Sequence, residues 1–147
     1  HEMVHGLDDL WAGRFKDLPP WLAEGRADYF RFSIVGRRVI PGAGMAVIKT
    51  TPAQPPLTDL MAAGWKEFND MKNAGPLYLY SWSWIHFLRH GADGRRAEAF
   101  DRFLSGEKGK LTRADFERTV GHCEGLEPEF KAYFEKEFPP VNRGKNK

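Results

Sequence analysis

The sequence predicts one mainly α-helical domain, and three observations carry that prediction. Its 147 residues are enough for one domain with a well-formed core, but not for two. Apolar residues recur at a helical period along most of the chain. Short apolar runs without that period are confined to residues 33–56, where glycines and prolines interrupt them. We expect a single domain over residues 1–140, followed by a basic, disordered tail over residues 141–147.

The first two expected helices cover residues 1–11 and 20–32. Pro19-Pro20 gives the second helix a start signal, because proline is favoured in a first helical turn. Residues 33–56 predict a loop with at most one short hairpin. The expected core positions of the second helix are Leu22, Ala23, Ala27, Tyr29 and Phe30.

Further helices are expected over residues 59–72, 76–89, 95–104 and 126–138. Thr58 is a suitable N-cap for the first of these. Thr112 with Asp115 resembles a capping box, which predicts a short helix carrying Phe116 and Val120.

Charge and composition exclude several classes of function. A formal net charge of +2, dispersed along the chain, is too small for the basic stripe of a nucleic-acid surface. No segment approaches the roughly 20 apolar residues that span a bilayer, so no membrane span is expected. Cys123 is the single cysteine and cannot form an internal disulfide; we expect a small buried hydrophobe there.

The most informative segment reads His1-Glu2-Met3-Val4-His5. Residues four apart on a helix differ by about 40° in azimuth and ~6 Å along the axis, so both imidazoles can face one cation. Glu2 can reach a water bound to that cation. This spacing is typical of the helix that binds zinc in many hydrolases.

Glu24 adds a third ligand to this hypothesis. Eighteen residues separate it from His5, and it lies on the next expected helix. Antiparallel packing of the two helices would bring its carboxylate to the same ion and leave the fourth position for water.

The sequence around these residues resembles that of the gluzincin metallopeptidases, the group that contains thermolysin and aminopeptidase N. The resemblance rests on His1-Glu2-x-x-His5 and on Trp21-Leu22-x-Glu24-Gly25-x-Ala27-x-Tyr29-Phe30. Tyr78-Leu79-Tyr80-Ser81-Trp82 is most similar to a bacterial peptidase MA-like family of otherwise unknown function. The resemblance implies the helical C-terminal part of a gluzincin catalytic domain, a peptide or protein substrate, and an extracytoplasmic bacterial parent.

The same resemblance implies a role for each matching residue. His1, His5 and Glu24 would hold zinc. Glu2 would take a proton from the activated water and pass it to the leaving amine.

Three further residues receive implied roles. Asp28, one turn after Glu24, would orient a ligand histidine by accepting its far ring N–H. Tyr78 would donate to the tetrahedral oxyanion, with Tyr80 as the alternative donor. For both tyrosines, plain packing in an aromatic-rich helix stays open as the other interpretation.

The sequence departs from the family in its N-terminal part. The β-sheet that precedes the metal helix in the family is absent from these residues, so we expect the catalytic domain to be incomplete. The α-ammonium of His1 and the positive end of the helix dipole both repel a dication. We therefore expect weakened zinc binding and impaired catalysis.

Two other functions compete with the peptidase. One is a non-catalytic helical module, or pseudo-peptidase, that offers an apolar association surface. The other is a copper site built from the His1 amine and two imidazoles, which is disfavoured because the proteins it resembles are β-sandwiches. His86, His90 and His122 lack partners at ligand spacing and are expected to be structural or surface residues.

Overall fold

The computed structural model describes residues 18–32, 54–70, 72, 74–106 and 111–138. Helices make up most of this part of the chain, and no strand occurs within it. The predicted mainly α class is therefore confirmed. The helix expected over residues 1–11, most of the loop expected over 33–56 and the tail over 141–147 lie outside the described residues.

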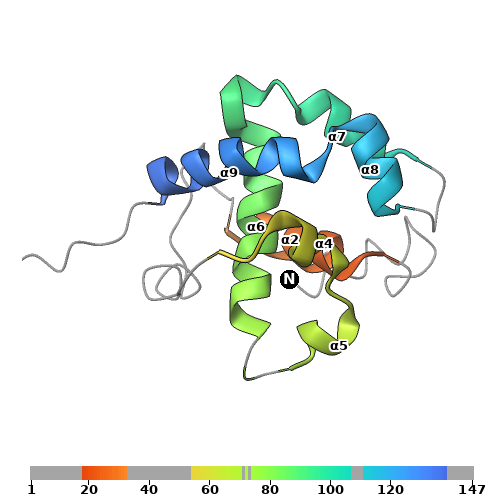
Figure 1. Cartoon of the computed structure of the whole chain (residues 1–147), viewed down its shortest axis with the longest axis vertical. Coiled ribbons are helices and arrows are strands. Elements are labelled where there is room, and N and C mark those ends of the chain that lie inside the picture. The colour runs from red at the N-terminus through yellow and green to blue at the C-terminus, as the bar shows by residue number, and fades with distance from the viewer. Residues whose placement is uncertain (1–17, 33–53, 71, 73, 107–110, 139–147) are drawn as a thin grey trace, which may run out of the picture.

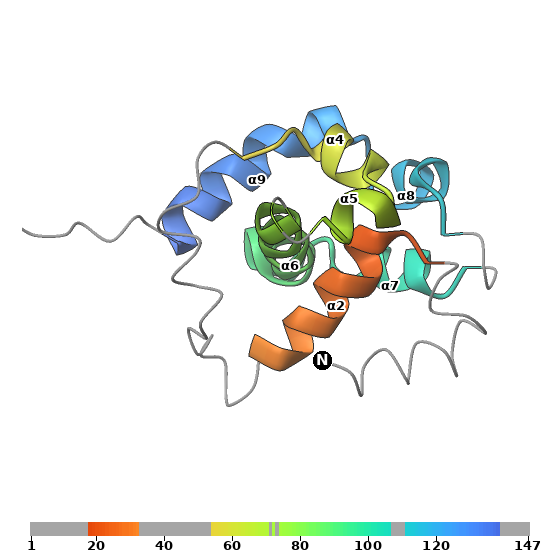
Figure 2. The same cartoon turned by 90° about the horizontal axis from the view of Figure 1, so that it is seen from below.

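Helix α6 (Ala74–His90) is central, and the other described helices pack around it (Figures 1 and 2). Between Leu79 and Leu88 every side chain is buried except that of His86, which is half-buried. A helix that is apolar on all sides needs partners on all sides, which explains its place in the middle. The helix expected over 76–89 is thus confirmed, with its start at Ala74.

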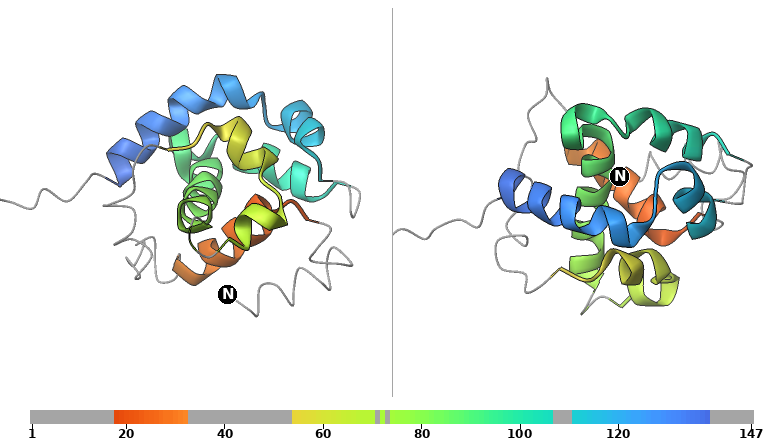
Figure 3. Two further views of the ribbon diagram at one scale, coloured as in Figure 1. Left: turned by 60° about the horizontal axis from the view of Figure 1, so that its bottom comes forward. Right: turned by 45° about the horizontal axis from the view of Figure 1, so that its top comes forward.

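Helix α2 (Pro20–Phe32) has the predicted bounds and packs against α6 more extensively than any other pair of described elements. Figure 3 shows α2 running obliquely across α6. The predicted burial of Leu22, Ala23 and Ala27 is confirmed, and Tyr29 is partly buried. The predicted burial of Phe30 is wrong, because its side chain is 47% exposed.

The helix expected over residues 59–72 is in fact two short helices, α4 (Leu57–Ala62) and α5 (Trp65–Phe68). The backbone is extended at residues 63–64, which ends one helix before the next begins. Thr58 lies inside α4 and does not cap it, so that prediction is also wrong. The break still leaves the expected apolar side chains of Leu60, Met61 and Phe68 in the core.

The C-terminal half contains a 3-10 turn, η2 (Gly91–Gly94), and helices α7 (Ala97–Leu104), α8 (Arg113–Thr119) and α9 (Cys123–Glu137). The capping box at the start of α8 is confirmed. The Thr112 hydroxyl accepts from the Asp115 backbone N–H at 3.2 Å, and the Asp115 carboxylate accepts from the Thr112 N–H at 3.2 Å.

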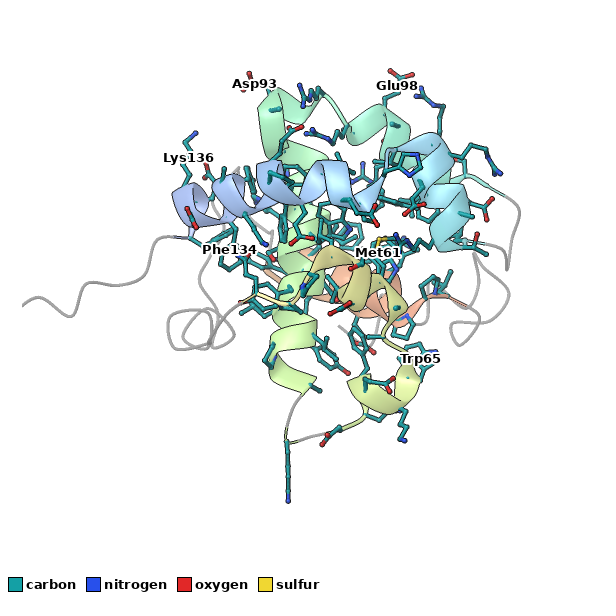
Figure 4. All side chains as sticks on the ribbon, viewed as in Figure 1. Met61, Trp65, Asp93, Glu98, Phe134 and Lys136 are labelled. Carbon is teal, nitrogen blue, oxygen red and sulfur yellow. The ribbon has the colours of Figure 1, made fainter. Side chains whose placement is uncertain are left out.

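Aromatic rings fill the space between α6 and its neighbours. The Trp84 ring on α6 lies 5.9 Å from that of Phe116 on α8 and 5.1 Å from that of Phe130 on α9. Cys123 is completely buried at the start of α9, as predicted. In Figure 4, Phe134 and Met61 lie among the helices, whereas Lys136 and Glu98 project outward.

Gly25 allows α2 to approach α6 closely. A Cβ atom at this position would lie 2.7 Å from the Ser81 carbonyl oxygen and 2.8 Å from its carbonyl carbon. Both are backbone atoms, which cannot move aside as a flexible side chain can. The contact therefore requires glycine, and it fixes the separation of the two helices beside Glu24.

Replacing Gly25 with alanine should push α2 away from α6. We expect Gly25→Ala to lower the free energy of unfolding by about 1–3 kcal/mol, as overpacking typically does. Gly125→Ala on α9 is the matched control, because an added methyl group would meet nothing within 4 Å beyond its chain neighbours and the backbone of its own helix. It should be neutral or stabilising by up to about 1 kcal/mol. Urea unfolding of both variants checks this, and equal effects would contradict it.

Candidate functional site

Two carboxylates lie buried one helical turn apart on α2. Glu24 is 5% exposed and Asp28 is 7% exposed. Residues at this spacing have Cβ atoms about 6 Å apart on the same face of a helix. Acidic side chains are rarely this buried unless a cation or hydrogen-bond donors lie close to them.

Tyr78 reaches the same place from the first half of α6. Its phenol donates a hydrogen bond to the Glu24 carboxylate. Burial, together with the negative charges of Glu24 and Asp28, raises the pKa of Tyr78 to about 12. The phenol therefore keeps its proton at physiological pH and acts as a donor. The structure thus brings together three of the residues that the resemblance singled out.

His1, Glu2 and His5 lie outside the described residues. Of the residues predicted to hold zinc or to orient its ligands, the structure therefore describes only Glu24 and Asp28. Their chemistry fits: Glu24 offers a carboxylate oxygen, which is an ordinary zinc ligand. The neighbouring carboxylate of Asp28 is the kind of group that orients ligand histidines.

Tyr80 lies in a different environment from Tyr78. Its ring packs 5.5 Å from that of Phe134 on α9, and its side chain is buried in the core. Two residues along a helix turn the side chain by about 200°, which is why the two tyrosines face different neighbours. Tyr78 thus lies beside the Glu24 carboxylate, whereas Tyr80 lies against α9.

A second group of possible ligands was not found by sequence reasoning. Glu117, His122 and Glu124 place one ligand atom each within 4.8 Å of one another. His122 thus has acidic neighbours, contrary to the expectation that it lacks partners. Spacings of five and two residues across a turn are too irregular to signal a site in advance.

Arg113 already neutralises much of this second group. Its guanidinium contacts the Glu117 carboxylate at 2.7 Å and the Glu124 carboxylate at 2.9 Å. His122 Nδ1 lies 3.5 Å from Glu117 and its side chain is 80% exposed. The arrangement is that of a solvated ion-pair cluster whose cation is an arginine.

Comparisons of the chain with protein-family models, with curated proteins and with solved structures find no match. Among the described residues, every helix is too short or too polar to cross a bilayer. The chemistry of the site therefore has to be argued from its own side chains.

Two histidines on α6 lie just beyond the candidate site. The rings of His86 and His90 are 4.6 Å apart, and each has a phenol partner: Tyr133 for His86 at 2.6 Å and Tyr29 for His90 at 2.9 Å. Burial, and to a smaller extent His90, lowers the pKa of His86 to about 4. The folded protein therefore holds His86 in its neutral form near neutral pH.

This neutral histidine should make the fold sensitive to acid. A histidine in an unfolded chain titrates near pH 6.5, so the unfolded state binds the extra proton first. We expect the free energy of unfolding to fall as the pH drops from about 6.5 towards about 4.5, above the range of most carboxylates. His86→Gln should flatten that slope, and thermal unfolding across this pH range measures it.

His122→Gln is the matched control, because the His122 side chain is 80% exposed. It should leave the slope unchanged. A slope that is the same in the wild type and in His86→Gln would show that burial of this ring does not govern the response.

Proposed function

We propose that the protein is a zinc-dependent peptidase of the His-Glu-x-x-His…Glu type. The observation that carries the proposal is that the half-buried phenol of Tyr78 lies beside the buried carboxylates of Glu24 and Asp28. The two carboxylates come from α2 and the phenol from α6, 50 positions further along the chain than Asp28. Burial of two acidic groups beside a phenol has no advantage for packing, whereas it suits a cation site.

His1, His5 and Glu24 would hold the ion. Zinc supplies a Lewis acid and an activated water when it is bound. Glu2 would accept the proton of that water and deliver it to the leaving amine, since an amine leaves far more easily once protonated. Asp28 would hold a ligand imidazole in the correct tautomer.

Tyr78 would stabilise the negative oxygen that develops on the substrate carbonyl. Its raised pKa keeps the proton on the phenol, and its hydrogen bond to Glu24 holds the group at the site. A phenol has one O–H donor, so this proton would turn from Glu24 to the oxyanion as charge develops, while the ion engages Glu24.

The alternative, a non-catalytic module with an apolar association surface, has weaker support. In the described part of the chain, Phe30 is the only large hydrophobic side chain that is exposed. A single ring is far smaller than the patch that a stable partner needs.

Zinc content tests the proposed site. We expect about one zinc per chain by elemental analysis after dialysis, and strong loss in Glu24→Gln, which keeps the shape but removes the charge. The measurement should be repeated with a short peptide added before His1, so that its nitrogen is an amide and not a charged amine.

Glu124→Gln is the control, because it changes the same residue type within the second group of ligands. Zinc retained in Glu24→Gln but lost in Glu124→Gln would move the ion to α8 and α9. Absence of zinc from both chains, with and without the added peptide, would contradict the proposal.

Tyr78→Phe tests the oxyanion role. We expect kcat for a peptide library to fall by about 10²–10³, as when one oxyanion donor is removed, with KM and zinc content little changed. Tyr80→Phe is the control and should leave kcat nearly unchanged. Equal losses in the two variants would indicate a packing effect of this helix instead.

A further inference from the structure

Two histidines in the last turns of α6 form a pair that the proposed zinc site does not use. His86 and His90 are four positions apart, which places both imidazoles on one face of the helix. Two histidines at this spacing can share one metal ion, contrary to the expectation that neither has a partner at ligand spacing. The centres of their rings lie 4.6 Å apart.

The separation of the two rings suits one shared ion. A metal ion bound to an imidazole lies ~2.0–2.1 Å from the nitrogen, and hence about 3.2 Å from the centre of the ring. At the angles of square-planar or tetrahedral coordination, two such rings have centres about 4.5–5.2 Å apart. The observed 4.6 Å lies within this range, so both rings can reach one ion with little rearrangement of α6.

One nitrogen of each ring is held by a phenol from a neighbouring helix. The Nδ1 atom of His86 lies 2.6 Å from the Tyr133 hydroxyl on α9, and the Nε2 atom of His90 lies 2.9 Å from the Tyr29 hydroxyl on α2. Helices α9 and α2 lie on different sides of α6 (Figure 2). A phenol oxygen can accept the N–H of an imidazole, and such a bond on the far nitrogen fixes the tautomer and orientation of a metal-binding histidine.

The other nitrogen of each ring is free to bind an ion. Neither His86 Nε2 nor His90 Nδ1 has a hydrogen-bond partner among the residues that the structure describes. His90 is exposed, and His86 Nε2 does not belong to the fully buried polar atoms without a partner, so solvent reaches both. Burial is the main cause of a lowered pKa in both histidines, so each offers an uncharged lone pair near neutral pH.

The surroundings of the pair also suit a bound cation. Arg89, whose charge acts on the second histidine, is paired with the Asp101 carboxylate at 2.7 Å. The rings of Trp82 and Phe138 lie 5.6 Å and 5.8 Å from that of His86. Such an apolar wall limits the access of water to one side of the ion and lowers the local dielectric constant, which strengthens binding by the two nitrogens.

We propose that His86 and His90 bind one late first-row divalent metal ion, such as Zn²⁺ or Cu²⁺, through Nε2 of the first and Nδ1 of the second. Imidazole nitrogen is a preferred ligand of these ions. Tyr133 and Tyr29 are positioning residues, because they hold the far nitrogens and leave the other two turned to the ion. Two protein ligands leave further positions of the ion open for water or for a nitrogen or oxygen donor of another molecule.

Zinc titration of the whole chain, followed by heteronuclear NMR of the imidazole nitrogens, tests this site because it reports which atoms bind. We expect saturable shifts of His86 Nε2 and His90 Nδ1 at a Kd below about 1 mM, while the other nitrogen of each ring keeps its proton. The same shifts should occur in Glu24→Gln, which removes a ligand of the proposed zinc site. The two sites share no residue, so either can fail without the other.

Variants locate the binding. Loss of the partner of a ligand histidine costs about 10–100-fold in metal affinity, so Tyr29→Phe and Tyr133→Phe should each weaken zinc binding by at least tenfold. Each should also leave its histidine as a mixture of tautomers, which the nitrogen signals show. His86→Gln and His90→Gln should weaken the affinity at least as much as the tyrosine variants do.

His122→Gln is the matched control, because it removes an exposed histidine from another part of the molecule and should leave the affinity unchanged. If His86→Gln does not fold, as judged by circular dichroism, His90→Gln carries the test, since its side chain is exposed. The proposal is wrong if zinc causes no saturable shift of the two nitrogens, or if His90→Gln and His122→Gln bind zinc equally well. Loss of the shifts in Glu24→Gln would also overturn it, by assigning them to the first site.

Discussion

The close contact between α2 and α6 at Gly25 sets the geometry on which the proposed zinc site depends. Without a side chain at that position, the α2 backbone meets the Ser81 carbonyl, and the side chains on either side of it are carried against α6. Glu24 thereby reaches Tyr78 near the start of α6, and Tyr29 reaches His90 at its end. A larger residue at position 25 would force the two backbones apart at this point of contact.

The burial of Glu24 and Asp28 is the strongest physical argument for a cation at the first site. Two carboxylates one helical turn apart repel each other, and each loses hydration when it leaves water. One phenol donor offsets part of that cost for Glu24. In the proposed site, a dication with two imidazoles would offset this cost further.

Much of the helical framework could be predicted from the sequence, because local signals fixed it. Pro19-Pro20 marked the start of α2, and Thr112 with Asp115 marked the start of α8. The prediction of one helix over 59–72 was wrong, because the apolar residues keep a helical spacing on both sides of the break. The sequence pattern therefore gave no sign of the extended backbone at residues 63–64.

Prediction of the site depended on a different kind of information. Periodicity identifies apolar faces, so it could not indicate that Glu24 is buried while Phe30 is exposed. The resemblance supplied the roles of Glu24 and Tyr78, and it left Tyr80 as an alternative. The choice between the tyrosines needed the orientation of α6, since it is the rotation of about 200° between them that turns one towards α2 and the other towards α9.

Acidic and basic side chains lie on different flanks of α2, on either side of its contact with α6 at Gly25. Glu24 and Asp28 project from one flank of α2, and Arg26 projects from the other. Gly25 lies between these flanks and contacts the backbone of α6. On α6, Tyr78 and Arg89 are eleven residues apart, which returns them to within about 20° of the same azimuth and ~16 Å along the axis. One stripe of α6 therefore carries a phenol beside Glu24 at one end and a guanidinium paired with Asp101 at the other. Acidic and basic side chains are thereby kept on opposite flanks of α2, so a cation at Glu24 would meet carboxylates and not Arg26.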